Sequence, residues 1–138
     1  MIMSAHDPAN RRKYLSIGEG ERFLKAALHQ TPDRRAFCET IFIVGCRISE
    51  ALALTVSDLN RHECEARFLT LKRRSIQFRD VPLPRALVDK LWALGRDSHD
   101  GKIWAFSRTT GSRVIKRVMA DAAITGIQAV PKGLRHGF

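Results

Sequence analysis

Arginine and lysine side chains are the residues of this sequence whose type and spacing best fit a chemical role. Arginine donates two parallel hydrogen bonds from a planar, permanently protonated guanidinium, and lysine acts as a compact point charge. Both bind anionic groups, phosphate above all. The candidates recur in short clusters along the chain, and they are Arg47, Lys72, Arg73, Arg74, Arg113, Lys116, Arg117, Lys132 and Arg135.

The overall charge agrees with such a role. Lysine and arginine number 24 against 14 aspartate and glutamate residues, which gives a formal net charge of +10 and a pI near 10.4. This excess favours polyanionic partners, of which nucleic acid is the commonest and an anionic membrane surface the second. Composition alone leaves open whether the chain binds DNA or RNA specifically or is merely basic.

Other kinds of chemistry find little support. Cys38, Cys46 and Cys64 are odd in number and form no CxxC pair, so we expect reduced core thiols and neither a disulfide framework nor a zinc site. The five histidines show no HExxH spacing, and Gly18-Glu19-Gly20 lacks the third glycine and preceding strand of a nucleotide-binding loop. We therefore expect no metal and no cofactor. No run approaches the ~20 apolar residues of a membrane span, and the start lacks the apolar run of an export signal, so a cytoplasmic protein is expected.

Five helices are predicted around these cations. Ser16 is a helix-capping residue, Pro32 suits a first helical turn, and Gly45 suits a helix end because it tolerates positive φ. Apolar residues recur at helical intervals between these signals. The predicted helices span residues 16–28, 32–44, 49–54, 84–94 and 110–124.

The middle of the chain changes to a strand pattern. Residues 66–71 and 76–83 are rich in β-branched and aromatic residues and flank the basic tip Lys72–Ser75, which predicts a hairpin. Residues 103–106 indicate a buried strand or extended piece, with Trp104 and Phe106 in the core, and a final turn is possible over 132–138. The order predicts one α+β domain, mainly helical with a small antiparallel sheet at its edge. Residues 1–14 are expected to form a flexible basic arm, and 15–138 the domain.

Three segments resemble motifs of the tyrosine recombinase (phage integrase) family. Gly45-Cys46-Arg47-Ile48-Ser49-Glu50-Ala51-Leu52-Ala53-Leu54 is similar to the first box, Gly-x-Arg-[hydrophobic]-Ser-Glu-x-x-x-Leu. Pro131-Lys132-Gly133-Leu134-Arg135-His136-Gly137-Phe138 is similar to the second, usually His-x-Leu-Arg-His-x-Phe. Residues 70–84 between them resemble the hairpin that carries the family's catalytic lysine. The order and separation of the three fit the front portion of the recombinase catalytic domain.

The resemblance implies a function and a role for particular residues. In this family a tyrosine attacks a DNA phosphate, giving a 3′-phosphotyrosine link and a free 5′-hydroxyl without metal or nucleotide cofactor. Arg47 and Arg135 would clamp the phosphate, and Lys72 would be the general acid that protonates the departing 5′-oxygen. Glu50 would hold the Arg47 guanidinium in place, and His136 would be a supporting, structural residue.

The chain departs from the family pattern in two ways. Lys132 stands where the family usually has histidine, and a charged lysine donates a hydrogen bond but cannot accept a proton. The third box, with a Gly-His pair and the nucleophilic tyrosine, is not found up to Phe138. The single tyrosine, Tyr14, precedes the first box and is expected to be an arm or packing residue, with a nucleophilic role as the alternative. We therefore expect this chain to bind DNA without cutting it.

The expected partner is duplex DNA. The resemblance implies a tetramer on DNA for a complete recombinase, whereas this chain alone is expected to be a monomer. Two alternatives remain: an inactive DNA-binding remnant or regulator of the same fold, and an RNA-binding domain, for which no aromatic stacking motif is found. The expected additional DNA contacts are cationic, those on the last helix having a solvated face as their alternative, and they are Arg73, Arg74, Arg113, Lys116 and Arg117.

Overall fold

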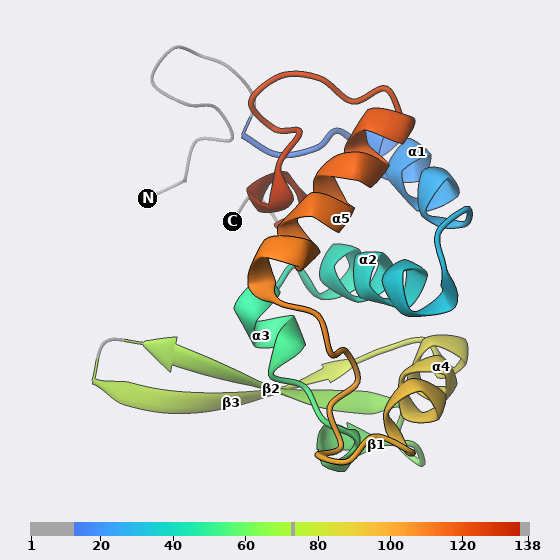
Figure 1. Ribbon diagram of the computed structural model, residues 1–138. Helices are drawn as coiled ribbons and strands as arrows, with labels where there is room; N and C mark the ends of the chain where they lie inside the picture. Colours follow the sequence, from blue (N-terminus) through green and yellow to red (C-terminus); the bar gives the residue numbers. More distant parts are fainter. Residues whose placement is uncertain (1–12, 73, 136–138) are drawn as a thin grey trace.

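The fold is mainly helical with a small antiparallel sheet, as the sequence predicts. The computed structural model describes residues 13–72 and 74–135, apart from the side chains of residues 71 and 72. The elements of this part are α1 (Ile17–Ala27), α2 (Pro32–Val44), α3 (Ile48–Leu52), the 3₁₀ turn η1 (Val56–Asp58), β1 (Leu59–Asn60), β2 (Glu65–Lys72), β3 (Ser75–Pro82), α4 (Arg85–Gly95), α5 (Arg108–Asp121) and the 3₁₀ turn η2 (Pro131–Leu134). Figure 1 shows α1, α2 and α5 packed together, with the β2–β3 hairpin and α4 below them in this view. Within these elements, no helix is long and apolar enough to cross a membrane.

The capping residues define the first two helices where they were predicted. The Ser16 hydroxyl accepts a hydrogen bond from the Glu19 N–H at 3.2 Å, and the Glu19 carboxylate accepts one from the Ser16 N–H at 2.9 Å. Pro32 occupies the first position of α2. Gly45 ends α2 with φ of 70°, the left-handed conformation that favours glycine. The third helix begins at Ile48, one residue earlier than predicted.

The hairpin is longer and its turn tighter than predicted. The β2–β3 register runs from Glu65 opposite Pro82 to Lys72 opposite Ser75. Lys72 and Ser75 therefore form the last rung of the ladder, and the predicted placement of both in the tip is wrong. The short strand β1, which pairs with β2, was not predicted because two residues carry no recognisable alternation.

The two faces of the hairpin differ in burial. Ala66 and Phe68 face the core and are buried, whereas Leu69, Ile76 and Phe78 on the opposite face are 37%, 62% and 65% exposed. On this outer face Arg67 donates to both carboxylate oxygens of Asp80, at 2.9 and 3.2 Å. The hydrogen bond from Arg67 lowers the pKa of Asp80. The alternation explains why the predicted strand pattern is clear here.

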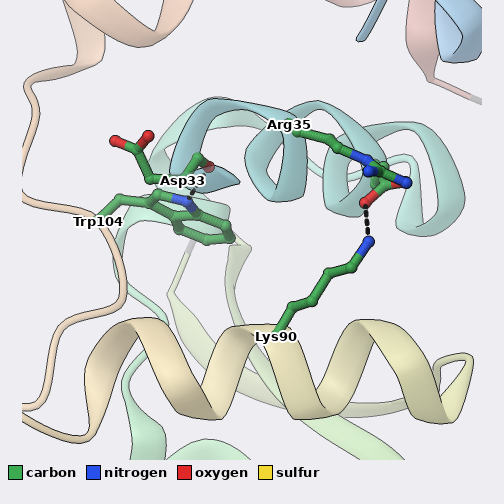
Figure 2. A network of polar contacts seen from close by, with 5 residues as sticks. Asp33, Arg35, Lys90 and Trp104 are labelled. Atoms are coloured by element: carbon green, nitrogen blue, oxygen red, sulfur yellow. Dashed lines mark hydrogen bonds and ion pairs between the residues drawn. The ribbon is translucent and has the colours of Figure 1, made fainter. Parts of the chain in front are cut away.

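The aromatic core joins α2 to the segment before α5. Phe37 is fully buried and packs edge-on against Trp104 and Phe106, with ring centroids 5.3 and 5.0 Å away. The Trp104 indole N–H donates to the Asp33 carbonyl oxygen at 2.8 Å (Figure 2). Residues 103–106 form no strand, so the strand alternative of the prediction is wrong, and the packing of Trp104 into the core is confirmed.

Helix α4 is attached to α2 by an ion pair as well as by apolar contacts. Lys90 reaches from α4 to Glu39 on α2, with 3.4 Å between the ammonium nitrogen and a carboxylate oxygen (Figure 2). Arg35 contacts the other oxygen of the same carboxylate, also at 3.4 Å. Leu87, Val88 and Leu91 form the buried stripe of α4.

Candidate functional site

Arg47 is placed by a sharp change of direction between α2 and α3. After Gly45 the chain buries Cys46, and Arg47 is extended, with φ of −77° and ψ of 155°, at the N-terminal end of α3. The Glu50 carboxylate accepts a hydrogen bond from the Arg47 backbone N–H at 2.8 Å. With Ile48 buried on the next position, the Arg47 side chain is left on the exposed side.

Lys132 and Arg135 lie at the other end of the chain, on η2. The Arg135 N–H donates to the Lys132 carbonyl oxygen at 3.1 Å, which closes the turn. Leu134 is 4% exposed and anchors the turn in the core. Arg135 is half-buried and Lys132 is exposed.

Helix α5 contributes a third set of residues. The Ser107 hydroxyl accepts a hydrogen bond from the Thr110 N–H at 3.2 Å, so the helix begins at Arg108, two residues before the predicted start. Arg108, Ser112 and Lys116 follow one another at intervals of four residues and therefore share a face. The opposite face of α5, with Val114, is buried.

One cleft of about 660 Å³ is lined by all three sets. Figure 1 shows why: α3 and η2 each lie against α5. Among the described residues the lining includes no carboxylate, and it consists of Cys46, Arg47, Ile48, Ser49, Arg108, Ser112, Lys116, Val130, Pro131, Lys132 and Arg135.

The chemistry of the cleft is that of an anion site. Three guanidinium groups, two ammonium groups and two serine hydroxyls line it. Within the described residues, none of the five cations forms an ion pair with an acidic side chain. The same part of the chain holds no cluster of three or more His, Cys, Asp or Glu side chains placed to bind a metal. Unpaired guanidinium groups suit the non-bridging oxygens of a phosphodiester.

The pKa of Cys46, which lines the cleft, reflects the charges around it. Burial raises the pKa of its thiol to about 12, and the charge of Glu50 acts in the same direction. The charges of Arg79 and Arg135 act in the opposite direction and lower this pKa. Arg79 pairs with Phe68 in the ladder and so belongs to the inner face of the hairpin. It is a further cation close to the cleft.

A second hollow of about 380 Å³ adjoins the cleft and shares Val130, Lys132 and Arg135 with it. Lys13 and Tyr14 form its other side, and both are half-buried. Tyr14 and Arg135 therefore line the same hollow. Residues 1–12 of the predicted arm lie outside the described residues.

No protein-family model matches the chain. The tyrosine recombinase XerD of Brucella abortus is 31% identical over 133 residues, which cover 86% of this chain and 40% of XerD. The crystal structure of XerA recombinase superposes with a TM-score of 0.73 at 23% identity, over 89% of this chain and 47% of XerA. XerH bound to its difH substrate in a pre-cleavage complex gives the same TM-score at 17% identity, over 95% of this chain and 46% of XerH.

The chain is related to the tyrosine recombinases over part of their length. It spans less than half the length of each relative named above. The predicted resemblance to these recombinases is confirmed over the part of their length that the chain spans, and the predicted fold is confirmed.

The predicted catalytic residues of a tyrosine recombinase are partly brought together. Arg47, Lys132 and Arg135 line one cleft. Lys72 is the last residue of β2, but its side chain lies outside the described residues, as do Arg73 and His136. Glu50 contacts the Arg47 backbone, so the expected contact with the guanidinium is not found in the described part of the chain.

The cations predicted to contact DNA are divided between the cleft and other parts of the surface. Lys116 lines the cleft, whereas Arg117 pairs with Asp121 at 3.3 Å along α5. Arg74 and Arg113 are exposed away from the cleft lining. The sequence prediction missed Arg108, which the capping signal of Ser107 would have included in the helix, and Arg79, which strand alternation places on the inner face.

The buried position of Cys46 predicts slow alkylation. At pH 8 a thiol of pKa about 12 is ionised on the order of one part in 10⁴, and only the thiolate reacts. Iodoacetamide should therefore label Cys64, which is half-buried, well before Cys46 and Cys38. Mass spectrometry of peptides after timed quenching measures the three rates. In guanidinium chloride the three rates should converge, and equal rates for Cys46 and Cys64 in the native chain would contradict the placement of Cys46 in the cleft floor.

Proposed function

We propose that this chain binds duplex DNA by holding a backbone phosphate in the cleft between α3, α5 and η2. The observation that carries this proposal is the gathering of five cations around one cleft, with no carboxylate in the lining and no acidic partner for any of them among the described residues. Like charges held together repel one another, and a bound phosphodiester relieves this repulsion. A strand of DNA supplies such anions at regular intervals, so cations outside the cleft can bind neighbouring phosphates.

In a complete recombinase the same residues would serve strand cleavage. The attacking tyrosine oxygen forms a bond to phosphorus while the bond from phosphorus to the 5′-oxygen breaks. Arg47 and Arg135 would stabilise the charge that develops on the non-bridging oxygens, and Lys132 would donate a further hydrogen bond. The arrangement supports this role because these three side chains come from segments more than 80 residues apart and line one cleft.

Lys72 is proposed as the general acid for the departing 5′-oxygen. It pairs with Ser75 in the last rung of the hairpin. Arg79, which pairs with Phe68 in the same hairpin, lowers the pKa of Cys46 in the cleft lining, so the hairpin is close to the cleft. A proton delivered by Lys72 would reach the leaving oxygen from the hairpin side of the cleft.

Further DNA contacts are proposed for cations around the cleft. They extend the positive surface along α5 and along the hairpin, and their contacts would be to phosphates, without reading the bases. Residues 15–138 would then correspond to the front part of a recombinase catalytic domain, and the complete protein would act as a tetramer on DNA. The proposed contacts are Arg73, Arg74, Arg79, Arg108, Arg113, Lys116 and Arg117.

Neutralising a cleft arginine should weaken DNA binding. Arg47→Gln and Arg135→Gln are each expected to reduce the affinity for a 30-base-pair duplex about tenfold or more, since a charge-assisted hydrogen bond contributes about 1.5–3 kcal/mol. Each change should also lower the slope of log affinity against log salt by about one. Fluorescence anisotropy at several salt concentrations measures both quantities.

Arg34→Gln is the matched control for charge. Arg34 is exposed at the start of α2 and does not line the cleft, so its replacement should leave the affinity within about twofold. If Arg34→Gln weakens binding as much as Arg47→Gln does, net charge and not the cleft determines DNA binding.

Cleavage is tested with a suicide DNA substrate, which traps a covalent protein–DNA adduct. The 138-residue chain is expected to yield no adduct, because its single tyrosine, Tyr14, precedes the first box, whereas the family's nucleophile follows the second. Tyr14 shares a hollow with Lys132 and Arg135, so the experiment also tests it as a nucleophile. The adduct is detected by denaturing gel electrophoresis. An adduct that disappears with Tyr14→Phe would identify Tyr14 as a nucleophile, and it would overturn the proposal that cleavage needs a tyrosine outside this chain.

A further inference from the structure

The turn that carries Lys132 and Arg135 lies next to a buried, hydrogen-bonded pair of polar side chains, Glu19 and Gln128. Glu19 on α1 is 7% exposed and Gln128, shortly before η2, is 6% exposed. The Gln128 side-chain amide donates to Glu19 Oε2 at 2.9 Å, between residues 109 positions apart. The same amide nitrogen donates to the Thr125 carbonyl oxygen at 2.7 Å. This pair links the start of the domain to its last turn.

Glu19 has two tasks at once. Its Oε1 accepts from the Ser16 N–H at 2.9 Å, as the glutamate of a capping box does, while Oε2 accepts from Gln128. A capping glutamate performs the first task equally well at an exposed helix end. Burying a carboxylate costs free energy unless its oxygens are hydrogen-bonded. The contact with Gln128 gives the second oxygen of this buried carboxylate a hydrogen bond, which capping alone does not require.

The backbone of Gln128 transmits this link to the site. Its carbonyl oxygen lies against Gly133, where an added Cβ would stand only 1.9 Å away, so only glycine fits. The Gly133 N–H donates to the Val130 carbonyl oxygen at 2.8 Å, and the Gly133 carbonyl oxygen accepts from the Leu15 N–H at 2.9 Å. Gly133 directly follows Lys132 and stands two residues before Arg135. A shift of Gln128 therefore displaces the segment that bears both cations.

We propose that Glu19 and Gln128 are positioning residues, which fix the turn that presents Lys132 and Arg135 to the DNA phosphate without touching DNA themselves. This inference rests on the proposed function for its effect on DNA. Bidentate contacts of guanidinium with phosphate need the donor within about 0.5 Å of its place, so loosening the turn weakens binding even while both cations are retained.

Three variants separate positioning from helix capping. Glu19→Gln leaves one acceptor oxygen for two donors, so the cap and the link to Gln128 cannot both persist. Gln128→Leu removes the link and leaves the Ser16–Glu19 cap intact. Ser16→Ala is the matched control, because it removes the hydroxyl that accepts from the Glu19 N–H and leaves the Gln128 contact.

Hydrogen exchange of single amides, followed by NMR in the full 138-residue chain, tests the hold on the turn without DNA. Glu19→Gln and Gln128→Leu should speed exchange at Leu15, Gly133 and Arg135 about tenfold or more, while amides of α2 keep their rates. Ser16→Ala should speed exchange in the first turn of α1 alone. Unchanged exchange at Gly133 and Arg135 in Gln128→Leu would overturn the inference, and this variant decides if Glu19→Gln fails to fold.

Binding to the 30-base-pair duplex tests the consequence for function. Glu19→Gln and Gln128→Leu should each weaken binding about tenfold, the double variant no more than Gln128→Leu alone, and Ser16→Ala less than about twofold. Equal weakening by Ser16→Ala, or full affinity in Gln128→Leu, would overturn the positioning role. If the unmodified chain binds no duplex, the proposed function fails, and the exchange rates still decide whether the pair holds the turn.

Discussion

Crowding of like charge is the constraint on which this structure depends. Five cations line one cleft without an acidic partner among the described residues, and their mutual repulsion opposes the folded arrangement. The arrangement persists because each cation lies on an element that is fixed by a buried apolar residue. These residues are Ile48 next to Arg47, Val114 within α5 and Leu134 within η2. A phosphate bound in the cleft, as proposed, would reduce the repulsion that the core otherwise has to overcome.

The rest of the fold serves to bring these elements together. Phe37, with Trp104 and Phe106 packed on its ring, joins α2 to the segment that leads into α5. The reversal at Gly45 then presents Arg47, and the Glu19–Gln128 pair holds the last turn. The hairpin extends past α3 (Figure 1), and the charge of Arg79 on its inner face lowers the pKa of Cys46 in the cleft lining.

Local signals predicted the elements well, and long-range geometry limited the prediction of the site. Ser16 and Gly45 mark helix ends because each acts within one turn of chain, and both were predicted correctly. The start of α5 was predicted two residues late because the capping residue Ser107 follows an apolar run, and Arg108 was missed with it. Glu50 was expected to contact the guanidinium of Arg47. A glutamate three positions after the N-cap residue, here Arg47, reaches the backbone N–H of that residue more readily. The Glu19–Gln128 contact joins the two ends of the chain, and no local pattern predicts it.

The most direct test of the account is NMR of the arginine side-chain Nε–Hε groups during titration with duplex DNA. If the cleft holds a backbone phosphate, the signals of Arg47, Arg108 and Arg135 shift together and saturate at the same DNA concentration, while those of Arg34 and Arg61 stay in place. Shifts confined to Arg61, Arg85 and Arg96, with the three cleft arginines unchanged, would contradict it.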